Sequence, residues 1–354
     1  MKIGIPRALS YYNFYPFWLG FFSSLGIEIC LSDYTTKDTL SKGASLVVTE
    51  TCLPVKVYVG HILNLIDKGI DKIFVPSIQS LQNKIYNCSK LRGLPDLIRN
   101  VIKQDITIID ATLDLSDDKK LYDFLFEIAQ YFNIKDSNKI KQASKQGFQM
   151  YNNFHIMRRS GIDYKTALKY ASQNRVIIPN VEKEYPINIA LISHGYNIYD
   201  DLTSMKIFSK MEKLDVKVYT AENLSNEQMI EGISALDTQL YWANELEMTG
   251  AAGHFMQNNK IDGMITITAF GCGPDSLMVE KINKNSKIYN KPILNLTIDE
   301  QTGEAGFITR IEAFVDMLFR KKRANILKNI DLNDKSVLNK HAINKISKKH
   351  INNL

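Results

Sequence analysis

Short apolar runs alternate with longer segments of helical spacing through the first third of the chain. Runs of β-branched residues between turn residues predict strands, and apolar residues three and four apart predict helices. The predicted strands are Lys2–Ile5, Ile27–Leu31, Ser45–Thr49, Lys72–Pro76 and Thr107–Asp110, and the predicted helices are Phe14–Leu25, Val55–Lys68 and Leu94–Lys103. Apolar strands that alternate with helices are typical of a parallel sheet covered on both faces.

A second alternating unit begins near Ile187, after a polar, strand-free stretch in which Pro and Gly are scarce and a helical layer is predicted. Its predicted strands are Ile187–Ser193, Val216–Tyr219, Gly263–Thr268 and Ile293–Thr297, and its predicted helices are Leu202–Leu214, a long segment within Ser225–Asn259, Pro274–Asn283 and Ala305–Arg320. We therefore predict an α/β protein with two doubly wound, Rossmann-like parallel-sheet domains joined by that layer. The predicted divisions are an N-terminal α/β domain (1–117), the helical connecting layer (118–185), a C-terminal α/β domain (186–320) and a basic helical tail (321–354).

Composition excludes several classes of protein. The 354 residues are 45% hydrophobic and 23% charged, which suits an ordinary globular protein and excludes disorder, collagen and coiled coil. No apolar run approaches the roughly 20 residues of a membrane span. The start, MKIGIPRAL, lacks the basic region and unbroken apolar run of a signal peptide, so we expect a cytoplasmic protein.

The net charge of +6 belongs to the tail. Residues 321–354 hold nine Lys or Arg and two Asp, which leaves 35 basic and 36 acidic residues in the rest of the chain. A body with a balance of −1 and no aromatic-interleaved basic patch does not predict nucleic-acid binding.

Three of the four cysteines lie where a strand ends or a helix begins. Cys52 and Cys272 each follow a predicted strand and have Pro two residues later, and Cys88 lies between a strand and a helix. That edge of a doubly wound sheet is where ligands bind, and helix N-termini there lower thiol pKa values. Cys30, in contrast, falls inside an apolar strand and is interpreted as a buried structural residue.

Three thiols without a fourth suggest a particular kind of site. A closed zinc site needs four ligands, commonly in close C-x₂₋₄-C pairs, and the chain has no such pair. An iron–sulfur cubane held by three cysteines keeps one iron open for water or substrate. The spacing of 36 and then 184 residues is unlike a ferredoxin, so both domains would contribute ligands in the cleft between them. Unrelated loop cysteines remain the alternative.

Five ordered motifs resemble one family, the acyl-CoA dehydratase activase-related proteins, which are relatives of the 2-hydroxyacyl-CoA dehydratase subunits. The resemblance runs from residue 1 to about residue 320. The motifs are Gly4–Leu9, Cys52–Lys56 with Gly60 and His61, Leu91–Asp96, Gly271–Leu277 and Thr297–Gly306.

The resemblance implies a two-domain α/β fold with a [4Fe–4S] cluster in the interdomain cleft, held by Cys52, Cys88 and Cys272. It also implies a separate ATP-hydrolysing iron–sulfur activator that supplies low-potential electrons. The chain has no Gly-x-x-x-x-Gly-Lys loop, so this activator is expected to act in trans on a homo- or heterodimer. The implied reaction is reduction or dehydration of a small substrate, with an acyl-CoA as one candidate.

Three further residues are candidates for proton transfer beside the cysteines. Glu50 precedes Cys52, His194 follows a predicted strand, and Glu304 lies in a polar loop after the last strand. Glu50 and Glu304 have helix capping as their alternative role.

Several functions remain open. The chain is either an iron–sulfur reductase or dehydratase-like lyase component, or a non-catalytic electron relay or regulatory subunit that docks an activator. A Rossmann-like binding protein with incidental cysteines and a zinc protein are the further alternatives.

Overall fold

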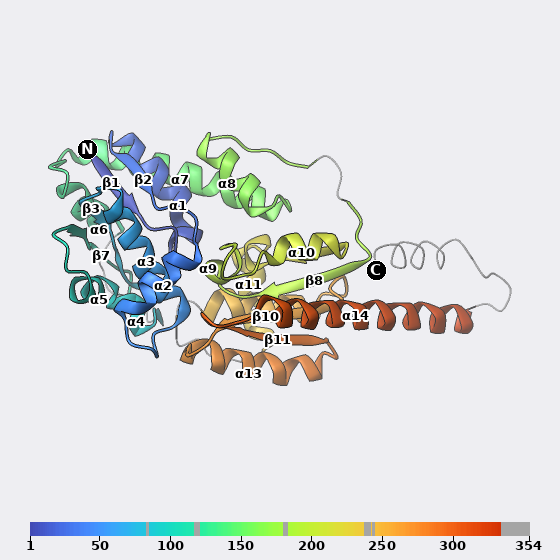
Figure 1. The fold of residues 1–354 in the computed structure, drawn as a ribbon. Coiled ribbons are helices and arrows are strands. Elements are labelled where there is room, and N and C mark those ends of the chain that lie inside the picture. Colours follow the sequence, from blue (N-terminus) through green and yellow to red (C-terminus); the bar gives the residue numbers. More distant parts are fainter. Residues whose placement is uncertain (83–84, 117–120, 180–182, 237–241, 243–244, 334–354) are drawn as a thin grey trace.

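The computed structural model describes residues 1–333 except 83–84, 117–120, 180–182, 237–241 and 243–244. Two four-stranded parallel sheets organise these residues, so the predicted α/β class with parallel sheets is confirmed. The N-terminal half (blue to green in Figure 1) lies beside the C-terminal half (yellow to red). No helix among the described residues is long and apolar enough to cross a membrane.

The N-terminal sheet has the order β2-β1-β3-β6, with every pair parallel. Its strands are β1 (Lys2–Ile5), β2 (Glu28–Leu31), β3 (Lys72–Phe74) and β6 (Thr107–Ile109). The helices of this half are α1 (Tyr11–Ser24), α2 (Lys37–Leu46), α3 (Leu53–Asp67), α4 (Ser89–Arg92) and α5 (Leu94–Val101). Phe21 and Phe22 of α1 are fully buried, so apolar burial fixes this helix on the core.

The strand predicted at Ser45–Thr49 is wrong. Ser45 and Leu46 end helix α2, and residues 47–49 form no strand. Thr36 begins this helix with a capping box in which its hydroxyl accepts from the backbone of Thr39. Val48, in the apolar run that suggested the strand, is 71% exposed, so this run does not belong to a buried strand.

A small third sheet was not predicted. It has the order β5-β4-β7 and comprises β4 (Ser77–Gln82), β5 (Ile85–Tyr86) and β7 (Thr112–Asp114). Its strands are short and polar, so they lack the apolar runs that reveal buried strands in a sequence. Cys88 lies two residues after β5.

In the described part of the stretch between the two parallel sheets, three helices follow. They are α6 (Leu121–Gln130), α7 (Ser137–Arg159) and α8 (Tyr164–Ser172). Asp136 and Asp163 cap α7 and α8, each accepting hydrogen bonds from backbone amides of the first turn. Helix α7 lies against α1, and its C-terminal end reaches the second half of the chain.

The C-terminal sheet has the order β11-β10-β8-β9, again with every pair parallel. Its strands are β8 (Ile187–Ile192), β9 (Val216–Tyr219), β10 (Gly263–Ala269) and β11 (Ile293–Ile298). Strand β10 is buried along its whole length, as expected for a central parallel strand.

The helices of this half are α9 (Gly195–Ile198), α10 (Ile207–Lys213), α11 (Asn226–Ala235), α12 (Ala251–Gln257), α13 (Gly273–Ile288) and α14 (Glu304–Asn333), with a 3₁₀ turn at Ala221–Asn223 and a π-helical segment at Leu246–Gly250. The helix predicted from Leu202 begins only at Ile207. Met205 and Lys206 have positive φ angles of 51° and 56°, which interrupt a right-handed helix. The tail beyond residue 333 lies outside the described residues.

Buried polar contacts join the two halves. The Lys56 ammonium on α3 donates to Glu300 Oε1 at 2.6 Å and to the carbonyl of Thr49 at 2.8 Å. The Tyr12 hydroxyl donates to Asp200 Oδ2 at 3.1 Å. Helices α1 and α3 of the N-terminal half are therefore held against segments that follow β8 and β11.

Candidate functional site

The three cysteines of the predicted site have the same local structure. Cys52, Cys88 and Cys272 are the N-cap residues of α3, α4 and α13, all with extended backbone. Proline in the first turn of α3 and of α13 fixes those helix starts, because no N–H is needed there. Each cysteine therefore lies beside backbone N–H groups that have no partner within its helix.

The chain brings these helix starts together from both halves. Gly271, with φ of 75°, lies so close to the Glu50 carbonyl that a Cβ built on it would be 3.6 Å from that oxygen. The Cys52 thiol is close enough to Cys88, and the Cys272 thiol to Cys52, for a charge on one to affect the pKa of the other. Burial raises the pKa of Tyr196 well above its usual range, and Asp275 and all three cysteines add to this.

Burial outweighs the helix N-termini in setting the thiol pKa values. Desolvation raises the pKa of Cys52, while nearby Lys90 opposes the increase. Desolvation also raises the pKa of Cys272, and the neighbouring Asp275 carboxylate raises it further. The expectation that helix N-termini lower the thiol pKa is therefore wrong for Cys52 and Cys272. Both thiols carry protons at neutral pH.

His194 follows β8 as the N-cap residue of α9 and is 2% exposed. Its Nε2 lies 2.9 Å from Asp275 Oδ1 and its Nδ1 lies 3.3 Å from Glu247 Oε2. Burial alone would lower its pKa, but the two carboxylates raise the pKa to about 10. His194 is therefore an imidazolium at neutral pH, and it stacks on Tyr196 with ring centres 5.1 Å apart.

Sequence reasoning missed Asp275, Glu247 and Tyr196. Asp275 is 1% exposed, its Oδ1 faces His194, and its carboxylate raises the pKa of the neighbouring Cys272 thiol. Asp275 lies three residues after Cys272 in the motif Gly-Cys-Gly-Pro-Asp, and this closeness to the cysteine could have identified it as a candidate site residue. Glu247 carries no comparable signal, because it reaches His194 only through the fold.

The predicted carboxylates Glu50 and Glu304 are exposed. Glu304 pairs with Lys210 Nζ at 2.9 Å and its side chain is 65% exposed. The Glu50 carbonyl accepts from Lys90 Nζ at 3.2 Å. Cys30 lies on β2, half-buried and packed against the core. Of the predicted proton-transfer residues, the structure brings His194 into the same buried polar group as Tyr196 and Asp275.

Among the residues that the structure describes, no group of three His, Cys, Asp or Glu side chains is arranged to hold a single metal ion. The three thiols approach one another without the close packing that one zinc ion requires. Cys52 and Cys88 come from the N-terminal half and Cys272 from the C-terminal half, so any group that they bind together would link the halves of the protein.

Fold and site define an α/β protein of two parallel sheets with cysteines at three converging helix N-termini. The chain belongs to the family described as the CoA enzyme activase uncharacterised domain (DUF2229), whose model matches residues 2–224. The resemblance to activase-related proteins is thereby confirmed. The match includes Cys52, Cys88 and His194 and ends before Cys272. A comparison with curated proteins gives no match.

Proposed function

We propose that this protein is an iron–sulfur protein in which Cys52, Cys88 and Cys272 hold a [4Fe–4S] cluster between the two halves. The observation that carries the proposal is that the three cysteines begin helices α3, α4 and α13, and that Gly271, beside Cys272, approaches the Glu50 carbonyl two residues before Cys52. A four-iron cluster bridges thiols that lie too far apart to bind one ion, so the absence of a single-ion site among the described residues fits a cluster.

Backbone amides around the thiols suit a bound cluster. Each thiol lies at the start of a helix, where amides without a partner in that helix can donate hydrogen bonds to cluster sulfurs, while burial and Asp275 oppose negative charge on the free thiols of Cys52 and Cys272. His194 adds a buried positive charge that is shared with Asp275. When bound, a cluster of this kind with three protein ligands supplies one low-potential electron at a time and an open iron.

Within this proposal the chain handles the proton. His194 holds one between Asp275 and Glu247, and Asp275 lies close enough to Cys272 to raise the pKa of that thiol. A proton beside an electron donor is what reduction or dehydration of a small substrate requires. An acyl-CoA is the candidate substrate class, in keeping with a family that is associated with CoA enzyme activases.

A partner that supplies electrons needs a surface to dock on. Apolar side chains on the segments around Cys52 and Cys272 are exposed, with Val48 at 71%, Phe270 at 68% and Leu277 at 63%. Exposed apolar groups of this kind favour protein association. We propose that an ATP-hydrolysing activator in trans binds there.

The test is electron paramagnetic resonance of anaerobically reconstituted protein after reduction with dithionite. The proposal predicts the signal of a reduced four-iron cluster that changes when a small anion such as cyanide is added, because one iron lacks a protein ligand. A signal that no small ligand changes would instead identify an electron relay. Protein that takes up no iron under these conditions would contradict the proposal.

A further inference from the structure

The His194 ring has one carboxylate at each of its nitrogens, and these two carboxylates differ in exposure. Its Nε2 lies 2.9 Å from Asp275 Oδ1, and its Nδ1 lies 3.3 Å from Glu247 Oε2. The side chains of His194 and Asp275 are each 2% exposed, whereas the side chain of Glu247 is 21% exposed. Of the two carboxylates, Glu247 is therefore the one that water reaches.

Glu247 is held in place by close packing of its own segment. It lies in the π-helical segment Leu246–Gly250, and π-helical turns are rare and frequently occur at functional sites. A Cβ on Gly232 of α11 would collide with the carbonyl oxygen of Gly250, and a Cβ on Gly253 would collide with the carbonyl oxygen of Gly232. Because backbone meets backbone here, the Glu247 carboxylate has a rigid support.

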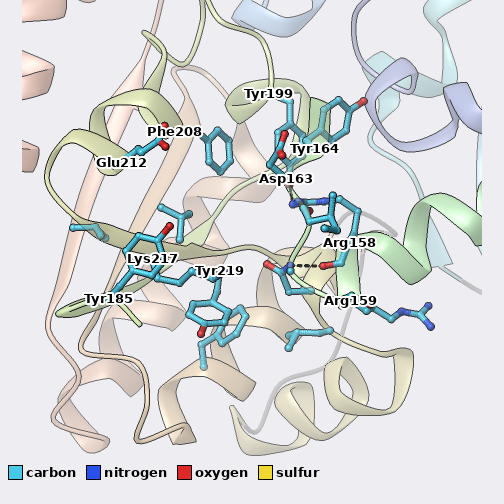
Figure 2. A pocket seen from close by; sticks show the side chains of 18 of the residues that line it. Arg158, Arg159, Asp163, Tyr164, Tyr185, Tyr199, Phe208, Glu212, Lys217 and Tyr219 are labelled. Atoms are coloured by element: carbon cyan, nitrogen blue, oxygen red, sulfur yellow. Dashed lines mark hydrogen bonds between the residues drawn. The ribbon is translucent and has the colours of Figure 1, made fainter. Parts of the chain in front are cut away.

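A further carboxylate near this group, that of Glu222, is already paired. Its Oε2 accepts from the Tyr199 hydroxyl at 2.6 Å and lies 3.8 Å from the Arg158 guanidinium. Figure 2 shows Tyr199 and Arg158 as neighbours in the wall of a groove, with the guanidinium 5.4 Å from the centre of the Tyr199 ring. Burial raises the pKa of Glu247, and the charge of Glu222 adds to the increase while His194 opposes it. A raised pKa allows a carboxylate to take up a proton more readily.

We propose that His194 exchanges its Nδ1 proton with water through Glu247. The Nδ1–H bond breaks and an O–H bond forms on the Glu247 carboxylate, so the ion pair becomes a neutral pair. Glu247 then gives this proton to a water molecule, takes another from the hydronium ion, and returns it to Nδ1. The Nε2 proton has no such route among the described residues, because Asp275 is as buried as the ring that it contacts.

This exchange gives Glu247 a role distinct from that of Asp275. In the part of the chain that the structure describes, Glu247 is the residue through which the charge of His194 follows the protonation of the solvent. Asp275 lies on the opposite side of the ring, towards Cys272. The use of this exchange in a reaction rests on the proposed function, whereas the exchange itself needs no cluster.

Nuclear magnetic resonance of the full chain, free of iron and with isotope-labelled histidine, tests this at neutral pH. Transfer of magnetisation from water measures the exchange rate of each imidazolium proton. The Nδ1 proton of His194 is expected to exchange at least about tenfold faster than the Nε2 proton. Glu247→Gln, which keeps a hydrogen-bond acceptor but cannot take up a proton, is expected to slow the Nδ1 proton at least about tenfold.

Asp275→Asn is the matched control, since it also removes one carboxylate from the ring but leaves Glu247 in place. It is expected not to slow the Nδ1 proton. Glu247→Ala separates proton transfer from a structural role, because it leaves space at a partly exposed position. Added formate is expected to restore the Nδ1 exchange that this substitution slows, since formate supplies the missing carboxylate.

Three outcomes would overturn the inference. They are equal exchange rates at the two nitrogens of the unaltered protein, an Nδ1 rate that Glu247→Gln leaves unchanged, and an Nδ1 rate in Glu247→Ala that formate does not increase. Circular dichroism of each variant confirms that it is folded before rates are compared. Since the protein contains no iron in these measurements, their outcome is independent of whether the cysteines hold a cluster.

Discussion

At the scale of single residues, the fold sets protonation states that the sequence does not reveal. His194 is charged because two carboxylates from distant segments meet it, while His61 is neutral because it is fully buried. His194 follows a predicted strand, and His61 lies in the middle of a predicted helix. Glu247 and Asp275, which lie 53 and 81 residues from His194 in the sequence, both contact its ring. Among the described residues, no carboxylate contacts His61, whose Nε2 lies beside the Thr35 hydroxyl.

Replacing Asp275 by Asn is expected to lower the pKa of His194 from about 10, because Asp275 is the carboxylate that raises it most. Glu247→Gln is expected to lower it less, since Glu247 Oε2 lies 3.3 Å from the ring rather than 2.9 Å. Nuclear magnetic resonance of the imidazole carbon and nitrogen during a pH titration measures both. A His194 pKa that Asp275→Asn leaves unchanged would contradict the ion pair.

His61 makes stability depend on pH on the acid side. Burial lowers its pKa from 6.5 to about 4, so between these values the unfolded chain binds a proton that the folded chain does not. The free energy of unfolding therefore falls as pH drops from 6.5 towards 4, by up to about 3 kcal/mol from this residue. Burial gives His155 the same pKa of about 4, so it adds a second contribution of the same sign.

In His61→Gln, the free energy of unfolding is accordingly expected to fall about half as much between pH 6.5 and 4 as in the unaltered protein. The remaining decrease is the contribution of His155. Urea unfolding at a series of pH values measures this. An acid-side slope as steep as in the unaltered protein would contradict the assignment of a neutral, buried His61.

At the scale of elements, close helix packing determines where Cys52 is held. Helices α2 and α3 approach each other so closely that a Cβ on Gly60 would lie 2.0 Å from the carbonyl oxygen of Thr39. Helix α3 begins at Leu53, directly after Cys52, so a shift of this helix would move that thiol. The short distance between helices is therefore part of the geometry of the site.

Gly60→Ala is expected to lower the free energy of unfolding by about 3 kcal/mol, because the added methyl group meets backbone that cannot move away. Gly306→Ala on α14 is the matched control, since a Cβ there meets nothing within 4 Å. That substitution is expected to be neutral or to stabilise by up to about 1 kcal/mol, as Ala favours helix. Chemical denaturation measures both, and equal effects would contradict the packing argument.

The sequence predicted both parallel sheets and the position of three cysteines at strand or helix ends, because apolar strands and Cys-x-Pro helix starts leave local signals. It did not predict helix α2, which depends on the Thr36 cap, or the small sheet that precedes Cys88. It also missed the contact of Asp275 with His194. Contacts of this kind join segments far apart in the chain and leave no local pattern.

At the scale of the whole molecule, ionic contacts hold the two halves together beside the candidate site. Lys56 and Glu300 are 244 residues apart, and their side chains are 3% and 30% exposed. Lys56 also lies one turn after Cys52 on α3, while Glu300 follows β11. The ion pair therefore couples the position of the Cys52 helix to the C-terminal sheet.

Glu300→Ala is expected to destabilise the protein by about 3 kcal/mol, because it leaves the buried Lys56 ammonium without its carboxylate. Lys56→Met is expected to cost less, since the partly exposed Glu300 can be solvated. The exposed pair of Lys2 and Glu28 is the control, and Glu28→Gln should change stability by less than about 1 kcal/mol. Thermal unfolding measures all three, and the reverse order for Glu300 and Lys56 would contradict this account.

The central claim is that cysteines from both halves hold one cluster, and iron and acid-labile sulfide content tests it most directly. Protein reconstituted without oxygen is expected to hold about four irons and four sulfides per chain. Cys52→Ala, Cys88→Ala and Cys272→Ala are each expected to lose them, whereas Cys30→Ala keeps them. No iron in the unaltered protein, or full iron content in Cys272→Ala, would contradict the claim.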